Sequence, residues 1–235
     1  MEQKPERPVS TPVRMLRVGW RVFKVAVVLL LIVCIAAAAV PLELNVAGRS
    51  QYPNLPNGCE AVAAAVSLEA MGVPVTAESF ADQYLPKAPV GSGVSPEEAY
   101  IGEPTSYNDG YYCLPPALAL GINRFLDTQN TSLTAKTHRL TPFSEIALRL
   151  HLEKKPVIVW LTSDDKLAQR SETVVWQVAG REYHPYTNLH AVVVDGVSGF
   201  KVHLVDSING ARWMPLTKFL PIYYSMGLRA VYFTD

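Results

Sequence analysis

The strongest feature of the hydrophobic pattern is an unbroken apolar run near the N-terminus. Residues 25–40 contain no charged and no polar side chain, and the run extends over residues 22–42 when Lys24, whose charge can reach the membrane surface, is included. This is about the length that a helix needs to cross the ~20-residue hydrocarbon core of a bilayer. Residues 1–24 hold six basic and two acidic side chains, and positive charge stays on the cytoplasmic side. We therefore expect a cytoplasmic basic tail over residues 1–21, a transmembrane signal anchor over 22–42 and an extracytoplasmic remainder.

Two other interpretations of the apolar run are possible. Ala37-Ala38-Ala39 fits a small-residue cleavage site, so the run could be a signal peptide that leaves a secreted protein. It could also be a buried core helix, although core helices rarely follow so many basic residues. The run is longer than a usual signal core, which favours a retained single-span anchor.

After a short linker over residues 43–50, the pattern predicts one domain over residues 51–235, because no repeat or second linker interrupts it. Its first half reads as helical. An alanine-rich helix that is apolar nearly all round is expected over residues 60–71 and should be buried. Further helices are expected after Thr76, near Pro115 and after Pro142, and residues 85–114 read as a long loop.

The second half of the domain changes to the pattern of strands. Two β-rich runs, 190–194 and 200–205, are joined by a hairpin signal at 195–199. Further strands are expected over 156–161, 173–178 and 229–233, with a helix over 216–224. Helices followed by a meander of strands are typical of an α+β fold with an antiparallel sheet.

Composition narrows the function classes. The chain is 49% hydrophobic and 18% charged, with 21 basic and 21 acidic residues, so it is neither disordered nor markedly basic. The balance argues against nucleic acid as a partner. There is no P-loop and no GxGxxG motif, and we expect no cofactor.

Cys59 is the strongest candidate for chemistry. It follows Gly58 at the start of the predicted buried helix, where free backbone N–H groups and the helix dipole favour a thiolate. The neighbouring carboxylate of Glu60 works in the opposite direction, so a reactive Cys59 needs a cation nearby.

His190 and Asp206 can supply that environment. His190 opens the first strand of the predicted hairpin and Asp206 ends the second, so the hairpin should bring the two side chains together. Gln51 precedes Cys59 and could donate its side-chain amide to an oxyanion. The chain order Gln, Cys, His, Asp is that of papain-like peptidases, which use Cys, His and Asn.

Five segments resemble the bacterial C39-like peptidases, a family of papain-like cysteine peptidases, and specifically their single-span branch. The likeness covers nearly all of residues 51–235. The matching segments, in order, are QYPNLPNGCE at 51–60, YCLPPAL at 112–118, KPVIVW at 155–160, NLHAVVV at 188–194 and VDSING at 205–210.

The resemblance implies a papain-like fold and hydrolysis of peptide or amide bonds in a peptide or protein substrate outside the membrane. It assigns Cys59 as nucleophile, His190 as general base and acid, Asp206 as the residue that orients His190, and Gln51 as oxyanion donor. Ser207 stands where the family usually has proline, which should loosen the turn that holds Asp206.

Several alternatives remain at this stage. The domain could be a binding module that has lost catalysis, or an acyl-transferase that uses the same thioester chemistry. Cys113 could be a buried free thiol or could form a disulfide with Cys59. Zinc bound by His184, His190 and Cys59 is the least favoured option, because no compact ligand spacing supports it.

Overall fold

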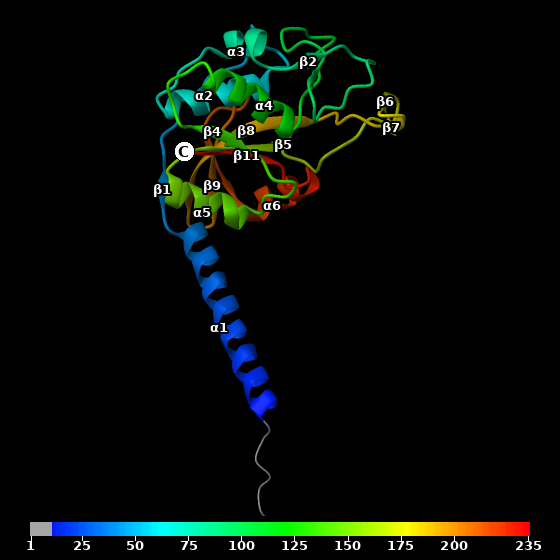
Figure 1. The fold of residues 1–235 in the computed structure, drawn as a ribbon. Coiled ribbons are helices and arrows are strands. Elements are labelled where there is room, and N and C mark those ends of the chain that lie inside the picture. Colours follow the sequence, from blue (N-terminus) through cyan, green and yellow to red (C-terminus); the bar gives the residue numbers. More distant parts are fainter. Residues whose placement is uncertain (1–10) are drawn as a thin grey trace, which may run out of the picture.

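The computed structural model describes residues 11–235. Its first element, helix α1 (Thr11–Ala39), projects from the rest of the molecule as a rod (Figure 1). Within the described residues, the stretch Val18–Ala39 is long and apolar enough to cross a membrane. The expected tail over residues 1–21 lies partly outside the described residues, and its described part is helical. The helix also ends earlier than expected, because residues 42–43 pair as a strand.

The domain is built on one central antiparallel sheet with the strand order β10-β9-β8-β5-β11-β4. A short strand, β1, pairs with the far end of β8. The strands of this sheet are β1 (Leu42–Glu43), β4 (Thr134–Lys136), β5 (Val157–Thr162), β8 (Leu189–Ser198), β9 (Lys201–Val205), β10 (Arg212–Pro215) and β11 (Ala230–Thr234).

Helices cover both faces of the sheet, and the alternation of side chains along each strand explains why. On β5, Ile158 and Trp160 belong to one apolar cluster, whereas Val157, Val159 and Leu161 belong to the other. The first cluster packs under α2 (Cys59–Ala70), α3 (Ala77–Gln83) and α4 (Pro115–Leu126). The second packs against α5 (Phe143–Glu153), α6 (Leu216–Ser225) and the end of α1, on the opposite side in Figure 1.

Helix α2 begins at Cys59 and places this cysteine against the sheet. Ten of its residues, from Cys59 to Leu68, are buried, as the all-round apolar pattern predicted. Gly58 precedes it, and a Cβ there would lie 2.6 Å from the Cβ of Leu55. Glycine is therefore required where the chain turns into the helix.

Several strand boundaries differ from the sequence-based expectation. β8 runs on to Ser198, so the hairpin turn is Gly199-Phe200 and not residues 195–199. Of the strand expected over 173–178, only β6 (Trp176–Val178) forms, and it pairs with β7 (Arg181–Tyr183) in a separate hairpin. The expected loop over 85–114 contains a short parallel pair, β2 (Lys87–Ala88) with β3 (Tyr100–Ile101).

The segment expected as a linker, residues 43–50, is attached to the domain along its first half. Leu44 N–H donates to the carbonyl of Asp195, and Val46 N–H donates to the Asp195 carboxylate at 2.9 Å. The other carboxylate oxygen of Asp195 lies 2.7 Å from Nδ1 of His203. Asp195 is fully buried, so this segment is held by long-range contacts that a local pattern does not reveal.

Candidate active site

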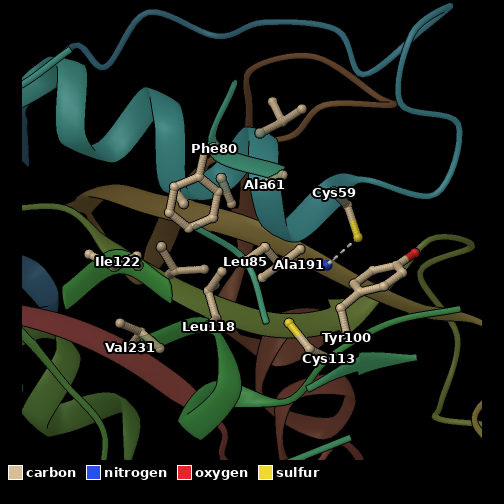
Figure 2. Close-up of a cluster of buried hydrophobic side chains, with 14 of the residues drawn as sticks. Cys59, Ala61, Phe80, Leu85, Tyr100, Cys113, Leu118, Ile122, Ala191 and Val231 are labelled. Carbon is tan, nitrogen blue, oxygen red and sulfur yellow. Dashed lines mark hydrogen bonds between the residues drawn. The ribbon is translucent and has the colours of Figure 1, made fainter. Parts of the chain in front are cut away.

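Cys59 is the first residue of α2, and its thiol faces the start of β8. The backbone N–H of Ala191 donates to Cys59 Sγ at 3.4 Å (Figure 2). On the other side, the thiol donates to Oε2 of Glu60 at 3.3 Å. Cys59 is buried, with 7% of its surface exposed.

Burial raises the pKa of the Cys59 thiol well above its ordinary value, and the negative charge of Glu60 raises it further. Glu60 is itself completely buried, and this burial raises the pKa of its carboxyl group to about 7. Its second oxygen accepts a hydrogen bond from the backbone N–H of Cys113 at 2.9 Å. The structure therefore favours a neutral thiol at rest, and a thiolate requires a cation close by.

His190 and Asp206 form the buried pair that the hairpin argument predicted. His190 Nε2 lies 2.7 Å from Asp206 Oδ1, and His190 is only 1% exposed. The β8–β9 register pairs Val193 with Val205, which leaves Asp206 just beyond the last pair and beside the start of β8. Because Nε2 faces the carboxylate, the remaining ring nitrogen, Nδ1, is the one available for another partner.

Asp206 is held by more groups than the sequence analysis identified. Its Oδ1 also accepts the backbone N–H groups of Ile208 and Asn209, at 2.8 and 3.0 Å. Its Oδ2 accepts Nδ2 of Asn209 at 3.0 Å and lies 3.4 Å from the Arg212 guanidinium. Burial alone would raise the pKa of Asp206, but the His190 hydrogen bond and these donors hold it well below its usual range.

Gln51 is buried next to the same turn, with its amide already engaged. Its Nε2 donates to the carbonyl of Pro56 at 2.6 Å, and its Oε1 accepts the hydroxyl of Ser207 at 2.7 Å. The Gln51 backbone N–H also donates to the carbonyl of Ser207 at 3.2 Å. One N–H of the side-chain amide remains available for a ligand.

Ser207 does not leave the turn loose as the sequence analysis expected. The Asp206 carboxylate accepts the N–H groups of Ile208 and Asn209, and Gly210 N–H donates to the Asp206 carbonyl at 3.0 Å. The Ser207 hydroxyl meanwhile joins the turn to Gln51. The spacing between positions 51 and 207 is too long for any local pattern to have indicated this contact.

The disulfide and zinc alternatives of the sequence analysis concern Cys113 and His184. Cys113 is buried and its thiol is free, as are those of Cys34 and Cys59. Among the described residues, no three metal-binding side chains come together, so the zinc option involving His184 is not supported by the geometry. The ring of His184 instead lies 2.9 Å from the carbonyl of Ser171.

A cavity of about 300 Å³ is lined by residues that lie close in sequence to Cys59 and His190, although neither of these two residues lines it. Its lining includes Asn57, two residues before Cys59, and Leu189, the neighbour of His190. Tyr111, Tyr112 and Tyr186 complete much of its wall, and no charged side chain lines it.

Comparison with known proteins agrees with this architecture. The crystal structure of a Bacillus anthracis protein described as a C39-like peptidase matches this chain with a TM-score of 0.70 at 21% identity. The match covers 83% of this chain and 98% of that one. This likeness shows the fold. No protein among the curated sequences matches the chain.

Two further structures match at lower similarity. One is a double-glycine motif protease of an AMS/PCAT transporter in complex with the leader peptide, with a TM-score of 0.46, 16% identity and coverage of 82% and 96%. The other is xylellain, a cysteine protease from Xylella fastidiosa, with a TM-score of 0.39, 13% identity and coverage of 85% and 86%.

The sequence model of the Peptidase_C39 like family matches residues 43–231, which is most of the chain and includes each residue of the site described above. The fold is the papain-like one that the sequence resemblance implied, with helices and an antiparallel sheet. The chain belongs to the Peptidase_C39 like family.

Proposed function

We propose that this protein is a membrane-anchored cysteine peptidase whose catalytic domain lies outside the cytoplasm and hydrolyses peptide or amide bonds in a peptide or protein substrate. Cys59 is the nucleophile, His190 the general base and acid, Asp206 its orienting partner and Gln51 an oxyanion donor. The anchor is α1, with the basic N-terminus on the cytoplasmic side.

The observation that carries the proposal is the buried His190–Asp206 pair, which stands one residue before the backbone N–H that contacts the thiol. The carboxylate accepts from Nε2, and the residue after His190 contacts Cys59 Sγ through its backbone N–H. The ring nitrogen that does not face the carboxylate is the one that can take the thiol proton, and the imidazolium formed in that step is the cation that a buried thiolate needs.

The reaction follows from these positions. His190 Nδ1 takes the thiol proton, and the Cys59 sulfur forms a bond to the carbonyl carbon of the substrate. The C–N bond then breaks, the leaving amine takes the proton from His190, and a thioester remains. Water gives a proton to His190 and attacks the thioester carbon, which releases the acid and restores the thiol.

The developing oxyanion needs two donors. The backbone N–H of Cys59 lies in the first turn of α2, where it has no partner within the helix. The N–H of Gln51 that is not bonded to Pro56 is the second donor. The contact with Ser207 fixes the orientation of the amide, because Oε1 accepts the serine hydroxyl and Nε2 is the end that keeps a free N–H.

The first test is removal of the nucleophile. We expect Cys59→Ala to lower turnover of a fluorogenic peptide library by at least about a thousandfold while the circular dichroism spectrum is unchanged. Cys113→Ala is the matched control, because it removes a neighbouring buried thiol that has no place in the mechanism, and it should keep its activity. A Cys59→Ala protein as active as the wild type would contradict the proposal.

A second candidate is a binding module without turnover. It is favoured by the contact between the thiol and Glu60, which opposes ionisation. The rate of Cys59 alkylation against pH separates the two. A peptidase should react rapidly well below pH ~8.5 and lose this reactivity in His190→Ala. Slow reaction near the ordinary thiol pKa, unchanged in His190→Ala, would favour the binding module.

A further inference from the structure

The junction between α1 and the domain is a direct packing contact. Ala37 and Ala38 are buried, and the carbonyl of Ala37 lies 3.0 Å from Nε2 of His151 on α5. The carbonyl of Ala39 accepts the backbone N–H of Gly199, in the β8–β9 turn, at 3.2 Å. Two separate elements of the domain therefore meet the last turn of α1.

The length of α1 sets the level of this junction relative to a bilayer. The candidate span Val18–Ala39, which holds Arg21 and Lys24 in its first part, has 22 residues, which rise about 33 Å in a helix at ~1.5 Å per residue. A hydrocarbon core of about 30 Å places Ala39 at its outer boundary. Groups bonded to Ala39 then lie among the lipid headgroups.

Phe200 is the side chain that the domain presents at this level. It follows Gly199 in the turn, and 55% of its surface is exposed. Its φ of 62° is in the left-handed region, where turns of this kind usually have Asn, Asp or Gly. An exposed phenylalanine in a strained turn adds little to folding, so its presence calls for another partner.

The neighbourhood of the turn suits a bilayer surface. Val40, the residue after α1, is 51% exposed, and Leu152, next to His151 on α5, is 73% exposed. Lys154 and Lys201 are exposed beside Leu152 and Phe200 and can meet lipid phosphates. Figure 1 shows α5 and the lower end of the sheet around the point where α1 leaves the domain.

We propose that the face formed by the Gly199-Phe200 turn and the end of α5 rests on the outer leaflet, with the Phe200 ring inserted at the boundary between headgroups and acyl chains. This rests on the membrane-anchored part of the proposed function. The fixed junction and the inserted ring together hold the domain in one orientation on the membrane.

Photocrosslinking from position 200 tests the contact. Phe200 is replaced by p-benzoylphenylalanine in the full chain, which is reconstituted in phosphatidylethanolamine/phosphatidylglycerol vesicles and irradiated. The excited ketone adds across a C–H bond of its neighbour, so intact-mass analysis should find protein carrying the mass of one lipid. The control has the same analogue at Tyr107, which is 70% exposed in the loop between β3 and α4, and should give no adduct above background. Helix α4 packs in the apolar cluster that does not contain the end of α1.

Alkaline carbonate extraction of the same vesicles distinguishes the two ways to fail. Protein that resists extraction but gives no lipid adduct at position 200, or gives a crosslinked dimer there, overturns the contact and leaves the anchor intact. Protein that is extracted overturns both the anchor and the contact. Peptidase activity of the Cys59 site is measured separately and does not depend on either result.

Discussion

At the scale of single residues, Glu60 and the Cys59 thiol are buried side by side, and ionisation of Glu60 makes ionisation of the thiol less favourable. The Glu60 carboxyl is hydrogen-bonded to both the thiol and the N–H of Cys113, so it joins the proposed nucleophile to the segment that precedes α4. Burial raises the pKa of both groups. The sequence analysis recognised the unfavourable charge, but not that Glu60 is completely buried.

Glu60 should make stability depend on pH. Its folded pKa of about 7 is above the ordinary value of 4.5, so its contribution to stability is complete below pH 4.5 and is lost as pH rises towards 7. Relative to Glu60→Gln, the wild type should lose about 3 kcal/mol of unfolding free energy over this interval. Urea unfolding of both full-length proteins in mild detergent, followed by tryptophan fluorescence, measures the difference.

The comparison with Glu60→Gln isolates this one group. Asp206, whose depressed pKa gives stability that is lost as pH falls, is present in both proteins and cancels. A wild type and a variant whose stabilities run parallel across the interval would mean that Glu60 does not titrate there.

Ser207 should act on catalysis through Gln51. Ser207→Ala leaves the buried Oε1 of Gln51 without its donor, and the amide can then rotate away from the oxyanion. We expect kcat to fall about tenfold with little change in KM, because the lost contact matters mainly in the transition state. Ser50→Ala, an exposed serine next to Gln51, is the control. An unaltered kcat in Ser207→Ala would show that Gln51 does not depend on this hydroxyl.

At the scale of elements, the sheet positions the site by alternation and register. Residues of β8 face the two clusters in turn, and the antiparallel pairing with β9 brings the end of one strand beside the start of the other. Two strands pair with successive parts of β8: β5 pairs with residues 189–194, and the short β1 pairs with residues 196–197. β1 therefore continues the sheet beyond the point where β5 ends.

Asp195 is the residue on which this attachment depends. Asp195→Ala removes the acceptor for Val46 N–H and the partner of His203, and should cost about 2 kcal/mol of unfolding free energy. Glu43→Gln is the matched control, since this exposed carboxylate lies 3.8 Å from His203 and should contribute less than about 1 kcal/mol. Equal losses in the two variants would contradict the role given to Asp195.

At the scale of the whole molecule, α1 and the domain meet without a free linker. The alanines of the possible cleavage site form the last turn of α1. Two of them, Ala37 and Ala38, pack in the apolar cluster that includes residues of α5 and β8. The segment that follows continues directly into the sheet. These contacts favour retention of the helix in the mature protein.

We therefore expect protein purified from membranes to keep residues 1–39. Cleavage would expose the apolar surface that Ala37 and Ala38 cover, so the folded domain is more stable with the helix attached. Intact-mass measurement and N-terminal sequencing check this directly. A mature N-terminus at or after Val40 would instead support a secreted protein released by signal cleavage.

Much of the fold could be predicted from the sequence because it depends on near neighbours. The apolar helix at 59–70, the helices after Pro115 and Pro142, and the two strands that carry His190 and Asp206 all follow from local periodicity and turn residues. Boundaries were less secure. Phe200 was expected in a strand, but it occupies the turn with a positive φ.

By itself, the amino-acid sequence determined the buried α2 helix, the α+β order of elements and the pairing of His190 with Asp206, since each depends on patterns within a few residues or one hairpin. Only the tertiary structure decided the contacts of Glu60 with Cys113, of Val46 with Asp195 and of Gln51 with Ser207. Their partners are 53, 149 and 156 residues apart. Hydrogen bonds at such separations exist only after the sheet and helices have packed, because packing, and not local preference, brings the donors to their acceptors.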